Sequence, residues 1–244
     1  MKKFHAFIFT MCFLVMNNSA DAQVSISLGV KAGLSIPNLK SKGDNPLDKG
    51  WESRSGLYGG LVADVHFSEN FAITTELNYS SQGGKRTGAQ AIPNPNPPPQ
   101  YLYADFKNIA IINYAEVPVM ATYKFSSASK THLIVQGGVY GGFLLRAKNV
   151  SSGESLIYLD EQLTIPVPLS PTQNFDHTTD IKEDIKSFNY GIQGAAGFTF
   201  DLASGSIRIL AGGNYGLTSI QKDTANGNDH TGAVTVTVGY LFNL

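Results

Sequence analysis

Hydrophobic and polar residues alternate one by one along eight segments of this 244-residue chain. The last segment is the clearest, because Val234, Val236, Val238 and Tyr240 share one parity while threonine and glycine occupy the other. A period of two residues is typical of a β-strand whose two faces meet different surroundings. The predicted strands cover 24–36, 56–67, 71–82, 109–125, 131–148, 186–201, 206–220 and 232–244.

The connections between these segments alternate strictly between short and long. The short ones are 68–70, 126–130 and 202–205, and the long ones are 37–55, 83–108, 149–185 and 221–231. In an up-and-down barrel this order places every long loop at one end and every tight turn at the other, which is typical of bacterial outer-membrane barrels. The pattern therefore predicts an all-β, eight-stranded antiparallel transmembrane barrel with four long external loops and three short periplasmic turns.

Three local features depart from regular strands. Pro118 falls inside the fourth strand, where its missing N–H predicts a β-bulge or a later strand start. The proline-rich run 93–99 predicts polyproline II or disordered chain. The charged stretch 176–186 predicts a short helical turn within the third long loop.

Thirteen aromatic residues share the apolar parity, and nearly all of them stand near segment ends. Phe67, Phe71, Tyr123, Phe125, Phe198, Phe200, Tyr240 and Phe242 lie towards the short turns, and Tyr79, Phe143, Phe188, Tyr190 and Tyr215 lie towards the long loops. Two such bands predict the aromatic girdles of a membrane barrel. A secreted, soluble lipocalin-like ligand-binding barrel also alternates, with its apolar face inward, and is the alternative. An interior enclosed by eight strands is too narrow for thirteen rings, which favours the outward orientation.

The opposite parity carries charged residues and would line the lumen. They are Lys31, Asp64, Glu76, Glu116, Lys124, Arg146, Asp201 and Arg208. Buried charges are tolerated when they are paired and hydrogen-bonded, and these residues balance in sign. We therefore predict a lumen plugged by polar and charged side chains, with a narrow porin-like channel for small solutes as the alternative.

The N-terminus predicts an export signal. Lys2 and Lys3 precede the apolar run 4–16, and Ala20-Asp21-Ala22 provides small residues at the spacing of a cleavage site. Residues 1–22 are thus predicted to be a cleaved signal peptide and 23–244 the barrel domain. The single cysteine lies in the leader, and charged residues make up only 15% of the chain, so neither disulfides nor a nucleic-acid partner is expected.

Candidate chemistry is sparse. His177 beside Asp176 and His230 beside Asp229 lie in long loops, and a membrane-embedded hydrolase or acyltransferase is the alternative that they leave open. The stretch 223–229 resembles a loose calcium loop but lacks the closing glutamate. We expect no catalytic residues, no metal site and no cofactor.

Four motifs resemble those of a known family. Gly29-Val-Lys-Ala-Gly33-Leu-Ser-Ile is similar to the opening of the PorT-like outer-membrane β-barrel family, and Tyr114 to Phe125 is similar to its proline-containing strand. The glycine-rich stretches 137–145 and 190–198 also fit this family. The resemblance implies a Gram-negative outer-membrane barrel. The family's named member takes part in secretion and gliding machinery, a role that the resemblance does not transfer to this chain.

Together these features predict a non-enzymatic envelope protein with a structural or interaction role. Its expected partners are outer-membrane lipid, the barrel-assembly machinery through the C-terminal strand, and an envelope protein at the long loops. The chain ends on Leu244, where such strands more often end on phenylalanine.

Overall fold

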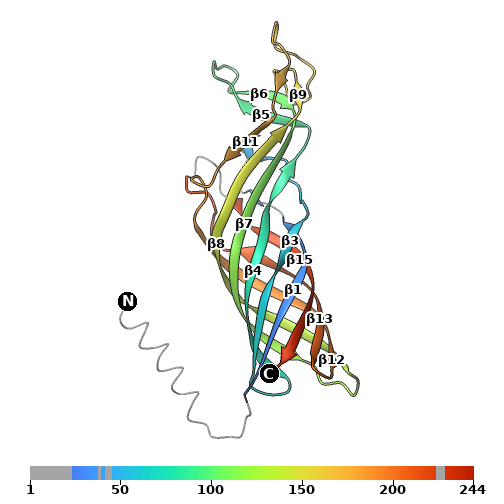
Figure 1. The fold of residues 1–244 in the computed structure, drawn as a ribbon. Helices are drawn as coiled ribbons and strands as arrows, with labels where there is room; N and C mark the ends of the chain where they lie inside the picture. Colours follow the sequence, from blue (N-terminus) through green and yellow to red (C-terminus); the bar gives the residue numbers. More distant parts are fainter. Residues whose placement is uncertain (1–23, 38–39, 42–45, 224–228) are drawn as a thin grey trace, which may run out of the picture.

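The computed structural model describes residues 24–37, 40–41, 46–223 and 229–244, and the predicted leader lies outside these residues. Long antiparallel strands close into a barrel (Figure 1). They are β1 (Ser25–Pro37), β3 (Gly56–His66), β4 (Phe71–Arg86), β7 (Lys107–Lys124), β8 (Thr131–Ser152), β12 (Phe188–Leu202), β13 (Gly205–Gly216) and β15 (Gly232–Asn243). Each of these strands pairs with the next along the chain, and β15 pairs with β1. The predicted eight-stranded up-and-down fold is therefore confirmed.

The two faces of the barrel wall differ sharply in polarity. On β15, Val236 is 47% exposed on the outer face, whereas the neighbouring Thr237 is 5% exposed on the inner face. The same alternation holds on β1, where Leu34 points outward and Ser35 is fully buried. An outer surface this apolar would be costly in water and suits hydrocarbon. This orientation contradicts the soluble lipocalin-like alternative, which requires the apolar face inside.

The connections sort by length between the two ends of the barrel (Figure 1). The short turns 67–70, 125–130 and 203–204 lie at the end where β1 begins and β15 finishes. The long connections 38–55, 87–106, 153–187 and 217–231 emerge at the opposite end. This asymmetry matches the prediction.

The long connections contain further strands that the sequence pattern did not predict. β5 (Ala89–Pro93) pairs with β6 (Tyr101–Asp105), β9 (Glu154–Ser155) with β10 (Gln173–Asn174), and β2 (Lys40–Ser41) with β14 (Asp229–His230). A short 3-10 helix, η1 (Pro46–Asp48), lies in the first long connection. β4, β7 and β8 run beyond the predicted boundaries, and β5, β6 and β9 lie beyond the outer ends of β7 and β8 (Figure 1).

Two loop predictions need correction. The stretch 176–186 begins with β11 (His177–Asp180), which was not predicted and pairs with β8 because the free edge of β8 offers backbone partners there. The predicted turn follows it, with the Asp184 N–H donating to the Ile181 carbonyl oxygen. The proline-rich run 93–99 forms the connection of the β5–β6 hairpin, whereas polyproline II or disordered chain was predicted. Among the described residues no helix is long and apolar enough to cross a membrane.

The expected bulge at Pro118 is also absent. Pairing of β4 with β7 runs from Phe71↔Tyr123 to Thr75↔Val119 and resumes in the same register at Asn78↔Glu116. On its other side Pro118 stays paired with Tyr140 of β8. The missing N–H of Pro118 therefore leaves only a short gap in the β4–β7 pairing. Strand β7 keeps its register and does not start later.

The burial pattern predicts a depth-dependent cost for charge on the outer face. Val236 lies midway along β15, whereas Tyr240 lies near the short-turn end. We expect Val236→Arg to lower the free energy of unfolding in lipid bilayers by about 2–4 kcal/mol and Tyr240→Arg by about 0–1 kcal/mol. Urea titration of vesicle-inserted protein, followed by the folded-band shift on gels, measures both. Equal costs at the two positions would contradict the proposed membrane depth.

Candidate functional site in the barrel interior

The inner face of the barrel presents polar residues because every second residue of each strand points inward. Near the short-turn end, Arg208 of β13 reaches across to Asp64 of β3, with Nη2 2.7 Å from Oδ2. The other carboxylate oxygen of Asp64 accepts a hydrogen bond from Thr74 Oγ1 at 2.7 Å. Both partners are buried, so this ion pair links strands that are not neighbours in the sheet.

A second ion pair lies in the middle of the interior. Lys31 Nζ of β1 is 2.6 Å from Glu76 Oε2 of β4, and it sits 4.7 Å from the centre of the Tyr58 ring. Asn78 Nδ2 donates to the same Glu76 oxygen and to the Tyr58 hydroxyl. Gln193 Nε2 donates to that hydroxyl from the far wall. The network therefore satisfies the buried charge and fills the lumen.

Glu116 occupies a third position in the interior. Its carboxylate accepts hydrogen bonds from Asn214 Nδ2 at 3.2 Å and from Gln82 Nε2 at 3.4 Å. Within the described residues it forms no ion pair, and only 1% of its surface is exposed. Carboxamide donors therefore take the place of a direct cationic partner, which the charge balance of the sequence did not indicate.

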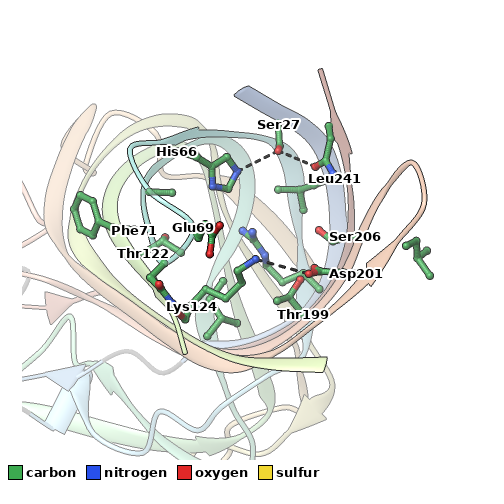
Figure 2. Close-up of a pocket in the computed structure, with 16 residues that line it drawn as sticks. Ser27, His66, Glu69, Phe71, Thr122, Lys124, Thr199, Asp201, Ser206 and Leu241 are labelled. Carbon is green, nitrogen blue, oxygen red and sulfur yellow. Dashed lines mark hydrogen bonds and ion pairs between the residues drawn. The ribbon is translucent and has the colours of Figure 1, made fainter. Parts of the chain in front are cut away.

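Two of the predicted lumen charges lie at the mouth on the short-turn side. Lys124 Nζ is 3.7 Å from Asp201 Oδ2, and His132 Nε2 is 3.2 Å from the same oxygen. They border a cavity of about 290 Å³, in which Figure 2 shows Lys124 and Asp201 meeting while His66 and Ser27 line another side. This cavity opens at the short-turn mouth of the barrel. The half-exposed side chains of Lys124 and Asp201 are therefore in contact with solvent.

Arg146 was wrongly predicted to point into the lumen, because it is exposed on the outer face. Asn113 of β7 pairs with Arg146 while the next residue, Tyr114, pairs with Leu144, so Leu145 is an extra residue in β8. Such a β-bulge reverses the parity of every residue beyond it. The alternating pattern alone gave no sign of this insertion.

An apolar cluster fills the barrel at the long-loop end. It contains Ala110, Ile112, Tyr114, Leu144, Ala147, Ile185 and Ile220, with Trp51 and Ile181 packed against it. Three of its residues come from β7 on the parity of Glu116, and Ile185 and Ile220 come from the third and fourth long connections. The sequence-based prediction missed this closure, although apolar residues on the inward parity of β7 were a usable signal.

The predicted aromatic residues lie on the outer face in the two expected bands. Ten of the thirteen are largely exposed, and Phe200, Tyr215 and Tyr240 are half-buried. Rings pair at both ends of the wall: Tyr240 and Phe242 have centroids 4.6 Å apart near the short turns, and Phe143 and Phe188 have centroids 5.1 Å apart near the long loops. The spacing of two bands around an apolar belt is what a bilayer requires.

The candidate catalytic pairs are not assembled into a reactive site. His177 is exposed on β11, and Asp176 accepts a hydrogen bond from the backbone of Gly153. His230 is buried and bonded to the carbonyl oxygen of Gly216, with its ring stacked on Tyr215. The described residues contain no cluster of three or more histidine, cysteine, aspartate or glutamate side chains that could hold a metal ion. The calcium-like stretch lies largely outside the described residues.

The family of the chain follows from a match that spans most of its length. The family model described as outer membrane protein beta-barrel domain matches residues 21–222. The chain belongs to this family. This outer-membrane barrel therefore has its short turns on the periplasmic side and its long loops outside, as such barrels do.

Solved structures with a similar fold include other small barrels of bacterial surfaces. Neisserial surface protein A is 13% identical, over 87% of this chain and 96% of that chain, with a TM-score of 0.37. Ail, the attachment invasion locus protein of Yersinia pestis, is 14% identical over 88% and 98%, with a TM-score of 0.36. The outer membrane protein OprG from Pseudomonas aeruginosa is 12% identical over 90% and 97%, with a TM-score of 0.34. No curated protein sequence matches this chain.

Truncating Asp64 of the buried ion pair should cost much more stability than truncating Arg146 on the outer face. We expect Asp64→Ala to cost about 3–5 kcal/mol of unfolding free energy, because it leaves Arg208 buried without its partner. Arg146→Ala should change stability by less than about 0.5 kcal/mol in phosphatidylcholine bilayers, because that side chain is exposed. Urea unfolding of both variants measures this difference. A large loss for Arg146→Ala would place its side chain in the lumen after all.

Proposed function

We propose that this outer-membrane barrel is a non-enzymatic structural or interaction protein of the envelope with a closed lumen. The observation that carries the proposal is the contrast between its two regions. The interior is occupied by ion pairs and sealed by an apolar cluster, while the ordered strands outside the barrel wall are concentrated in the external loops. No hydrolase or acyltransferase role is part of the proposal, because among the described residues neither His177 nor His230 is bonded to a hydroxyl group or a carboxylate.

The packing of the interior supports closure. One cavity beside Lys31 and Glu76 has a volume of about 10 Å³, which is at the limit for one water molecule, and the 290 Å³ cavity lies on the short-turn side of Arg208. Above it, the apolar cluster places Ile185 and Ile220 over the outer mouth. A porin-like path would need continuous polar space through both layers, so the channel alternative is less well supported.

The external loops form a connected platform, which supports an interaction role. The backbones of Tyr103 and Tyr158 exchange two hydrogen bonds, at 2.9 and 2.8 Å, and so join the second and third long loops. The rings of Phe106 and Phe175 stack at 4.5 Å between the same loops. A preorganised surface loses less conformational entropy on binding, which favours recognition of a partner.

Three finer assignments belong to the same proposal. The family resemblance of the β1 opening and of the proline-containing strand β7 favours a PorT-like barrel. Export by a leader cleaved after Ala22 rests on the charge and hydropathy of residues 1–22. Recognition by the barrel-assembly machinery rests on the alternating apolar strand β15.

The closed lumen predicts the absence of ion conduction. In planar bilayers the wild-type protein should give no unitary current steps, because the ion-pair layer and the apolar cluster both block the interior. A variant combining Lys31→Ser and Glu76→Ser with Ile185→Ser and Ile220→Ser removes one of the two interior ion pairs and the two loop residues of the apolar cluster at constant net charge, so it should pass more current than the wild type. Stable current steps from the wild type would favour the channel alternative instead.

The interaction role predicts a partner at the loop end only. A photo-activatable residue at Gln100, exposed in the connection of the β5–β6 hairpin, should crosslink to a discrete envelope protein in intact cells. The matched position Ser127, exposed in a short turn at the other end, should not crosslink to it. Phe175→Ala should weaken the Gln100 crosslink several-fold, because it removes the Phe106 stack. Crosslinks to lipid alone from Gln100 would contradict the role.

A further inference from the structure

A row of side chains on the outer face marks the upper boundary of the apolar belt. Tyr79, Ala115, Phe143 and Phe188 are register partners across β4, β7, β8 and β12. Tyr79, Phe143 and Phe188 are all largely exposed on this face. Aromatic side chains concentrate where acyl chains meet headgroups, so this row lies at the level of that interface.

The next row outward is polar and cationic. Ser81, Asn113 and Arg146 are register partners across β4, β7 and β8. On β4 and β7 this row lies two residues beyond the aromatic row, which corresponds to about 7 Å along a strand. Ser81 Oγ donates to Asn113 Oδ1 at 3.2 Å, and both residues are buried, so this bond ties β4 to β7 beneath the exposed Arg146.

Arg146 belongs to this row only because of the bulge at Leu145. Without the extra residue, Asn113 would face Leu145 and Arg146 would point inward, as simple alternation predicts. Bulges often re-aim a side chain for a purpose. Here the result is an exposed arginine in the row that follows Phe143 towards the long loops.

Two loops bring further cations to the ends of the row. From the first long loop, Arg54 Nη2 donates to Ser81 Oγ at 2.7 Å and to the Gln82 carbonyl oxygen at 2.9 Å. From the third long loop, Lys182 Nζ donates to the Leu145 carbonyl oxygen at 3.3 Å. The row therefore carries Arg54 at one end, and Arg146 and Lys182 at the other.

Protein carboxylates do not neutralise these cations within the described part of the chain. Arg54, Arg146 and Lys182 form no ion pair there. The acids closest in sequence to these cations are Asp180, Glu183 and Asp184 beside Lys182, and Glu52 near Arg54, which pairs with Lys85. Asp180 Oδ1 accepts the backbone N–H of Lys182, and Glu183 and Asp184 are exposed in the turn that follows.

We propose that Arg54, Arg146 and Lys182 bind the phosphate group of a phosphorylated lipid in the outer leaflet, and that the buried Ser81 holds Arg54 in place. Guanidinium and ammonium groups form strong charge-assisted hydrogen bonds with phosphate. A lipid source fits because the acyl chains of such a ligand would lie on the aromatic row immediately below. The site requires insertion of the barrel and is independent of the closed lumen and of any protein partner.

Binding of diphosphoryl lipid A to the detergent-folded barrel tests this proposal. We expect the wild type to bind the phosphorylated form and to bind its dephosphorylated product at least tenfold more weakly, measured by titration calorimetry in mixed micelles. Arg146→Ala should weaken binding about tenfold, and adding Lys182→Ala should weaken it further, because each change removes a charge-assisted contact. Both side chains are exposed, so the variants should fold, as gel mobility would verify.

Lys107→Ala is the matched control, because Lys107 is an exposed cation on β7 that lies six residues beyond Asn113. The affinity of the Lys107→Ala variant for diphosphoryl lipid A should stay within about twofold of that of the wild type. An equal loss in Lys107→Ala and Arg146→Ala would overturn the proposal, since it would indicate unspecific attraction to anions. Equal affinity for the two lipid forms would also overturn it. So would displacement of the lipid by an equal concentration of inorganic phosphate, because the site would then recognise a free anion.

Discussion

Closure of the sheet is the constraint on which the rest of this structure depends. In hydrocarbon each unpaired backbone N–H or C=O costs several kcal/mol, so a membrane sheet must have no edge. Pairing of β1 with β15, from Ser27↔Asn243 to Pro37↔Ala233, removes that edge. Once the ring is closed, alternate side chains have only two destinations, lipid or lumen. The wall tolerates Pro118 because the β4–β7 ladder resumes beyond it without a change of register.

A ring of eight strands also leaves little interior space, and this couples stability to the way the interior is filled. The charged residues inside cannot be hydrated freely, so they must meet each other. Asp64 and Arg208 do so across the lumen, and Lys31 and Glu76 do so one layer further out. The side chains that satisfy the buried charges are therefore the same ones that occupy the path of a solute. Opening such a path would require breaking contacts that hold opposite walls together.

The two-residue period predicted the strands and sorted the residues into two faces, and the thirteen aromatic residues together with the narrow interior predicted which face is inside. This placed Lys31, Asp64, Glu76, Glu116 and Arg208 in the interior. It carried this information because burial in a closed sheet depends only on parity. It failed where parity is interrupted or where contacts are distant in sequence. A one-residue insertion at Leu145 has no signature in an alternating pattern, so Arg146 was assigned to the wrong face. Local composition also does not encode contacts between distant segments. Two examples are the stacking of Phe106 on Phe175, which joins two loops, and the pairing of β11 with β8.

The bulge at Leu145 separates the membrane part of β8 from its external part. Because residue parity reverses at the bulge, each part can place its apolar residues on a different face. Below it, Val139 and Phe143 face outward on odd positions, as the apolar belt requires. Above it, the reversed parity turns Ala147 inward, where it joins the apolar cluster that closes the outer mouth. The same reversal moves a cation from the lumen, where it would need a buried partner, to the level of the lipid headgroups. A single extra residue thus relieves the interior of one charge, completes the external closure and supplies a cation to the polar row. Removing it would shift all three together, because they depend on one change of register.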